Sequence, residues 1–193
     1  MPIETTTQVL LSKAKGLATL RGFVTDELGD LVLKIGGQEV QAALKALSDV
    51  RLSSTPRREL ETGLTLLRLA QRRFMDTACQ TGLLADLRDD LKSFVTFGIG
   101  EPARLRAAES AMELSLLLAT AYRVLDEMQL VEAFIQEAFQ AYDCYAERCV
   151  NHARNSGGQR GAWSTFMVER EREKLSKLRR LLDELSNSIR TAV

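Results

Sequence analysis

Apolar residues recur at three- and four-residue steps along most of the chain, which is the spacing of helices with one buried face. The first such segment covers about residues 7–35 and contains three glycines spaced seven apart, Gly22, Gly29 and Gly36. We predict a continuous or kinked helix in which glycine lets a neighbouring backbone approach closely. The alternative is that Gly22 or Gly29 ends one helix and begins another. The pair Gly36–Gly37 predicts a firm helix end.

The same spacing predicts three more helices, at about 38–51, 55–79 and 83–94. Thr55 followed by Pro56 is a good helix start, because Thr can cap the first turn and Pro lacks an N–H that would have no partner there. In the first two of these helices one face is apolar and is expected to be buried. Its residues are Val40, Ala43, Leu44, Leu47, Val50, Leu60, Leu64, Leu67, Ala70 (or Gln71) and Phe74.

The densest apolar stretch, residues 101–155, predicts two long helices that form a central antiparallel hairpin with its turn near 127–130. Its most apolar run, 111–125, is shorter than the roughly 20 residues that span a bilayer, which favours a buried core helix. The second helix is expected to bury one apolar face. The residues of that face are Val131, Phe134, Ile135, Ala138, Tyr142, Tyr145, Ala146 and Cys149 or Val150.

After the hairpin, a glycine-rich linker at 156–161 leads to an amphipathic helix over 162–193. Its apolar residues follow heptad spacing and are flanked by mixed charges, which is typical of a coiled coil. This helix could pack on the 1–155 bundle in the same domain or act as an interaction arm. We predict that its seam contacts a partner through Leu175, Leu178, Leu182, Leu185 and Ile189.

These patterns predict an all-α fold, with six to seven helices bundled around the central hairpin and a coiled-coil-like C-terminal helix. Only three prolines and 6% aromatic residues occur in 193 residues, and the sequence contains no pair of predicted strands joined by a hairpin turn. A chain of this length can bury a core without a metal or a disulfide. We therefore interpret the three cysteines as small, reduced core residues of a cytoplasmic protein. Cys144 and Cys149, five apart on one helix, point about 140° away from each other and cannot bridge.

The charge of the chain gives little support for a nucleic-acid or membrane partner. The 26 basic and 26 acidic residues give no net charge, so there is no strong signal for nucleic-acid binding. Residues 1–50 mix five basic with six acidic side chains, which argues against contact with a membrane surface. The apolar turn before the central hairpin contains Phe97 and Ile99, which either tuck into the core or offer a patch to a partner.

Candidate chemistry is sparse. His152 is the single histidine, so the two Glu-x-x-His pairs of a di-iron bundle cannot be supplied, and the cysteines and this histidine do not have zinc-site spacing. We expect no metal and no cofactor. Gly98–Ala103 formally matches a dinucleotide-binding motif but lacks the strands that such a motif needs. Arg148 and His152 lie one helical turn apart, and the hairpin around them resembles the HEPN superfamily of helical domains. Three residues separate the pair, one fewer than the shortest spacing in that superfamily's ribonuclease motif.

We therefore expect a non-enzymatic helical module for protein–protein interaction or oligomerisation, such as an adaptor or scaffold. Its partner would be a second copy or another helical protein. The HEPN resemblance implies an alternative, a ribonuclease that uses His152, or an inactive relative of one. A second alternative is a membrane-active helical bundle, because glycine-rich amphipathic segments such as 16–37 occur in pore-forming proteins.

Overall fold

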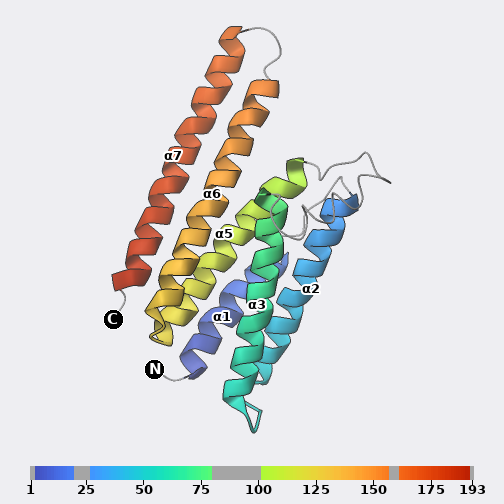
Figure 1. The fold of residues 1–193 in the computed structure, drawn as a ribbon, viewed down its shortest axis with the longest axis vertical. Coiled ribbons are helices and arrows are strands. Elements are labelled where there is room, and N and C mark those ends of the chain that lie inside the picture. The colour runs from blue at the N-terminus through green and yellow to red at the C-terminus, as the bar shows by residue number, and fades with distance from the viewer. Residues whose placement is uncertain (1–2, 20–26, 80–100, 157–160, 192–193) are drawn as a thin grey trace.

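The computed structural model describes residues 3–19, 27–79, 101–156 and 161–191 (Figure 1). These residues form an all-α bundle without strands, which confirms the predicted fold class within the described ranges. The predicted helix at 83–94, and Phe97 and Ile99, lie outside the described residues. The helices are α1 (Ile3–Thr19), α2 (Glu27–Asp49), α3 (Pro56–Cys79), α5 (Glu101–Val124), α6 (Met128–Ser156) and α7 (Gly161–Thr191).

Helix α5 occupies the middle of the bundle. It pairs with α6 in the predicted antiparallel hairpin, packs along α3, and also contacts α1, α2 and α7. Helices α2 and α3 form a second antiparallel pair on one side, and α7 runs back along α6 at the opposite edge (Figure 1). Other helices therefore cover most sides of α5, whereas α7 contacts only α6 and α5 among the described helices.

Local hydrogen bonds explain where the predicted helices begin and end. The carbonyl oxygen of Thr55 accepts the N–H groups of Arg58 and Glu59, so α3 starts at the predicted Thr–Pro signal. The hairpin turn lies at residues 125–127, slightly earlier than predicted. There Asp126 adopts a φ of 63°, and the N–H of Glu127 donates to the carbonyl of Tyr122 at 2.9 Å. This left-handed residue closes the end of α5 in the way that glycine usually does.

The core combines small residues from α5 with larger ones from α3 and α6. Six alanines of α5 are at most 1% exposed, which lets the neighbouring helices approach its backbone closely. They are Ala103, Ala107, Ala108, Ala111, Ala119 and Ala121. The apolar faces predicted for α2, α3 and α6 pack in or against this core, so those predictions are confirmed.

The predicted helix end at Gly36–Gly37 is wrong, because α2 runs through both glycines. Gly36 leaves room for Phe74 on α3, and Gly63 on α3 leaves room for Leu47 on α2. A Cβ atom on Gly36 would lie 2.8 Å from Cε1 of Phe74, and one on Gly63 would lie 2.7 Å from Cδ2 of Leu47. Close packing of α2 on α3 therefore outweighs the helix-breaking tendency of glycine. The prediction named a neighbouring backbone, whereas the group that approaches Gly36 is the ring of Phe74.

Helix α7 is fixed to α6 by apolar burial and by polar contacts near both ends of the contact. Leu175 and Leu182 are buried in the bundle, and the hydroxyl of Tyr142 donates to the carbonyl of Leu175 at 2.8 Å. Near the C-terminus, the guanidinium of Arg190 binds both carboxylate oxygens of Glu132, at 2.8 and 3.0 Å. This contact holds the pKa of Glu132 below its usual range. One side of α7 is thus occupied by its own chain.

Candidate functional site

The outward side of α7 exposes large apolar side chains. Leu181 is 50% exposed and Leu185 is 42% exposed, and Leu178 is half-buried beside them. Because these residues are three and four apart, they line up along one face of the helix. We call Leu178, Leu181 and Leu185 the outer stripe. It is adjacent to the buried face of α7 that contains Leu175 and Leu182, and α7 itself lies at the edge of the molecule (Figure 1).

The predicted contact residues of α7 divide between these two faces. Leu175 and Leu182 are buried against their own bundle, and Leu178 and Ile189 are half-buried against the same core. Leu185 alone of the five is exposed. Leu181 was not predicted, although the spacing 178, 181 and 185 is itself a helical one. Two overlapping apolar stripes therefore run along α7. Heptad counting found the covered stripe together with Leu178 and Leu185, and it missed Leu181.

Charged residues border the outer stripe on the side away from the bundle. Lys177 donates to Glu173 at 2.7 Å, and both side chains are largely exposed. Glu184, seven residues after Lys177 on the helix, is also exposed. On the bundle side, the guanidinium of Arg179 lies 4.4 Å above the ring of Phe139. The stripe is thus bordered by solvated charge on one side and by the contact with α6 on the other.

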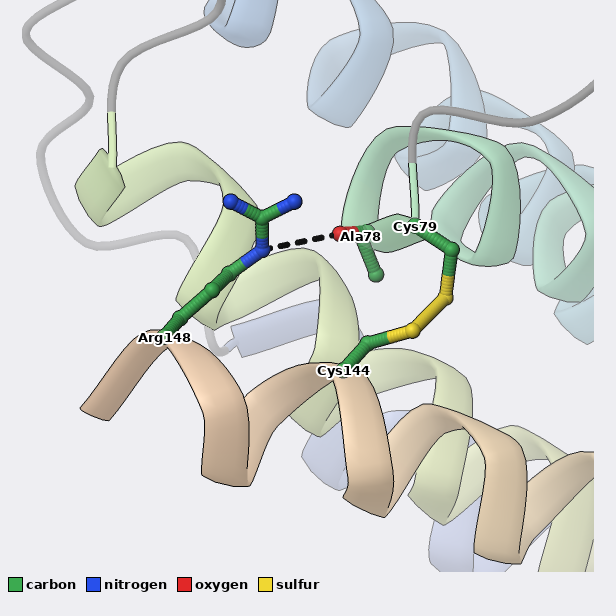
Figure 2. The surroundings of a disulfide bond; sticks show 4 residues. All are labelled: Ala78, Cys79, Cys144 and Arg148. Atoms are coloured by element: carbon green, nitrogen blue, oxygen red, sulfur yellow. Dashed lines mark hydrogen bonds between the residues drawn. A yellow bond between two sulfur atoms is a disulfide. The ribbon is translucent and has the colours of Figure 1, made fainter. Parts of the chain in front are cut away.

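Two of the cysteines form a disulfide, which contradicts the prediction of three reduced cysteines (Figure 2). Cys79 ends α3 and Cys144 lies in the middle of α6, and their Cα atoms are 5.7 Å apart. Spacing along one helix could exclude a bridge between Cys144 and Cys149, but only the packing of α3 on α6 brings together cysteines 65 residues apart. Disulfides persist mainly in oxidising compartments, so this bond does not favour a cytoplasmic location. The cytoplasmic location stays a prediction.

The remaining cysteine, Cys149, is half-buried on α6. Burial raises the pKa of its thiol, and burial likewise raises the pKa of the neighbouring Tyr145 hydroxyl. A thiol with a raised pKa is mostly protonated at neutral pH and is a weak nucleophile. This pair therefore has the character of a packed contact between helices, not of a catalytic centre.

Arg148, one of the two residues behind the HEPN resemblance, has a structural contact. Its Nε donates to the carbonyl of Ala78 at 2.9 Å, next to the disulfide (Figure 2). The last carbonyls of a helix have no partner within the helix, so this bond satisfies the end of α3. His152 is exposed on α6. The structure thus uses the arginine of the pair to join α3 to α6.

A polar contact crosses the interior between three helices. The amide nitrogen of Gln71 on α3 donates to Oγ of Ser115 on α5 at 2.9 Å and to Oε2 of Glu137 on α6 at 2.7 Å. Burial raises the pKa of Glu137, although Gln71 and the nearby charges of Arg68 and Arg72 act in the opposite direction. Because both donors of the amide are used, this contact fixes the register of the three helices and leaves no donor for a ligand.

Comparison with known proteins gave no relative: no family model, no curated protein and no solved structure matches this chain. Among the helices that the structure describes, none combines the length and apolar character needed to cross a membrane. Within the same described ranges, no three His, Cys, Asp or Glu side chains are grouped so that they could hold a metal ion. The outer stripe of α7, with Leu181 and Leu185 exposed, is the candidate functional site.

Proposed function

We propose that this protein is a non-enzymatic helical interaction module that associates with itself through the outer stripe of α7. The observation that carries the proposal is the exposure of Leu181 and Leu185, at 50% and 42%, on a helix whose other side is already packed. Burying a fully exposed leucine side chain contributes about 1.5–3 kcal/mol, so covering the exposed half of each of these leucines contributes about 1 kcal/mol and favours association.

The stripe suits recognition by another helix. Leu178, Leu181 and Leu185 follow the three-four spacing by which an amphipathic helix presents its contacts to a helical partner. A single exposed leucine is ordinary on a protein surface, whereas an aligned set bordered by charge is typical of a contact region. The surrounding charges would keep the surface soluble while the partner is absent.

The ribonuclease alternative is less well supported than self-association. Its motif would need Arg148 at a reaction centre, and that side chain is bonded to the end of α3 instead. The membrane-active alternative has no observation on the described residues that favours it over association through α7.

Sedimentation velocity of the full chain over a wide concentration range tests the proposal. We expect a reversible oligomer that the double variant Leu181→Glu, Leu185→Glu converts to monomer, because it places charge in the contact. Leu52→Glu is the matched control, since Leu52 is 90% exposed in the turn between α2 and α3, and it should associate like the wild type. A wild-type chain that is monomeric at every concentration, or a stripe variant that still associates, overturns the proposal.

A further inference from the structure

The disulfide links two parallel helices that otherwise make little direct contact. Helices α3 and α6 run in the same direction, and α5 packs against both in the opposite direction (Figure 1). Part-way along, Gln71 of α3 binds Glu137 of α6 at 2.7 Å. Eight residues further on, Cys79, the last residue of α3, is bonded to Cys144. The disulfide therefore fixes the end of α3 to α6.

Both cysteines of this bond lie at the border of the core. Cys79 and Cys144 are half-buried, whereas Ala78, next to Cys79, is fully buried. A disulfide is opened by a thiolate that reaches one of its sulfurs, so bonds that solvent reaches are the labile ones. The end of a helix also opens at a lower free energy than its middle. Cys79 can therefore separate from α6 without disrupting the rest of α3.

A non-covalent link holds the same end of α3. Arg148, one turn after Cys144 on α6, donates from Nε to the carbonyl of Ala78 at 2.9 Å (Figure 2). Phe74 and Ala78 are buried in the core, and Gln71 binds Glu137. None of these contacts involves a sulfur, so they persist when the disulfide opens. They keep the two thiols close together, and this high effective concentration favours closing of the bond again.

The third cysteine does not compete for the pairing. Cys149 lies five residues after Cys144 on the same helix, a spacing at which two cysteines cannot bridge. Its neighbours are Tyr145 and the charged side chains Glu171 and Lys174 of α7. Oxidation of the folded, reduced chain therefore restores the bond between Cys79 and Cys144.

We propose that the Cys79–Cys144 bond is a reversible redox site, which a dithiol opens and a disulfide reagent closes while the bundle stays folded. In the oxidised form the end of α3 is fixed to α6. In the reduced form Arg148 holds that end through a bond that opens and closes, so the last turn of α3 can separate from α6. This site is independent of the proposed association through α7.

The exchange proceeds in two steps. A thiolate of the dithiol attacks one sulfur and forms a mixed disulfide, and the other cysteine leaves as a thiolate. The second thiol of the reagent, as its thiolate, then attacks the mixed disulfide and releases the remaining cysteine. The reagent departs as a cyclic disulfide, having lost two electrons and two protons, and Cys79 and Cys144 become thiols. A disulfide reagent reverses both steps.

The rate of reduction shows whether the fold must open first. Dithiothreitol reduces the full-length protein without denaturant, and alkylation with mass spectrometry identifies the new thiols. Leu118→Ala weakens the fold, and Leu118 lies beyond Ser115, the partner of Gln71, on the side away from Cys79. Reduction through global unfolding would be about 100-fold faster in this variant. Reduction of the folded protein should change by less than about threefold.

Wild-type protein in urea below its unfolding transition gives the same comparison without a substitution. A rate that is nearly constant supports the proposal. A rate that rises in proportion to the unfolding constant overturns it, as does the 100-fold acceleration in Leu118→Ala. The reduced protein should keep a cooperative urea transition, and its absence would mean that the bond is needed for folding, contrary to the proposal.

Arg148→Met tests the non-covalent link, because methionine keeps much of the length of the side chain without its donor. The equilibrium with reduced and oxidised dithiothreitol should shift about fivefold toward the open form. Arg57→Met, at the exposed start of α3, is the control and should leave this equilibrium unchanged. An Arg148→Met equilibrium equal to the wild type would show that the arginine does not hold the site. Reoxidation that pairs Cys149 with either other cysteine would also overturn the proposal.

Discussion

Helices α5 and α7 contain five leucines each, yet they use them differently. In α5, Leu114, Leu117 and Leu118 are buried and the other two are half-buried, because other helices surround it. In α7, Leu175 and Leu182 are buried, while Leu181 and Leu185 remain exposed, because α7 lies at the edge of the bundle (Figure 1). A residue type therefore contributes to stability on one helix and is available for association on the other. Burial, which depends on the neighbours, makes the difference.

This contrast between interior and edge predicts where substitutions act. Changes at the contacts of α5 with α3 and α6 should lower the free energy of unfolding and leave any association of the remaining folded protein unchanged. Changes on the outer side of α7 should do the reverse. The following five experiments are ordered by the size of the expected effect on stability.

Breaking the disulfide should have the largest effect. The bond closes a loop of 65 residues, for which the chain-entropy model gives a stabilisation of about 4 kcal/mol. We expect urea denaturation under reducing conditions to show this loss. The double variant Cys79→Ser, Cys144→Ser should be equally destabilised and should no longer respond to reductant. Three titratable thiols in the unfolded, non-reduced protein would show that the bond does not form.

Leu118→Ala should destabilise the monomer by about 3 kcal/mol, because a fully buried leucine leaves a cavity among three packed helices. Chemical denaturation at a concentration too low for association measures the change. A loss below about 1 kcal/mol would mean that the centre of the bundle relaxes around the cavity, and that the interior is less tightly packed than α5 indicates.

Gly63→Leu tests the close approach of α2 and α3 by adding atoms to the contact instead of removing them. The added side chain would meet Cδ2 of Leu47 at its first atom, 2.7 Å from the position of the Cβ, and Leu47 is itself fully buried. Overpacking of this kind costs about 2 kcal/mol. The same substitution would be stabilising on an exposed helix surface, so an increase in the unfolding midpoint would contradict the close packing.

Glu137→Gln should change how stability depends on pH. Burial raises the pKa of Glu137 in the folded state above the ordinary value of 4.5, so the folded chain binds a proton more readily than the unfolded chain. The stability that this group contributes is therefore greatest at low pH and falls as pH rises from about the unfolded value to the raised one. Glutamine can still accept the bond from Gln71 and does not titrate. We expect the urea midpoint of the variant to vary less with pH over that range than that of the wild type. An unchanged pH dependence would argue against a raised pKa of Glu137.

Leu181→Ala should have the smallest effect on the monomer, below about 0.5 kcal/mol, since substitutions at exposed positions rarely exceed that value. It is the matched partner of Leu118→Ala, with the same atoms removed from the edge instead of the interior. The two should differ severalfold in denaturation of the monomer. A loss at Leu181 as large as at Leu118 would mean that the outer stripe is part of the core.

Sequence periodicity predicted most of the fold because it depends on neighbours along one helix. The α3 start at Thr55–Pro56 and the buried faces of α2, α3 and α6 follow from local capping and apolar spacing. The helix end at Gly36 failed for a related reason. Local propensity disfavours glycine within a helix, but Phe74 on another helix needs the space.

The sequence alone determined that the chain forms amphipathic helices and which face of most of them is apolar, since both are properties of residues a few positions apart. Only the tertiary structure decided the pairing of Cys79 with Cys144, the use of Arg148 at the end of α3, and which of the two apolar stripes of α7 remains exposed. Each of these depends on contacts between residues far apart in the chain, and such contacts exist only once the helices have packed.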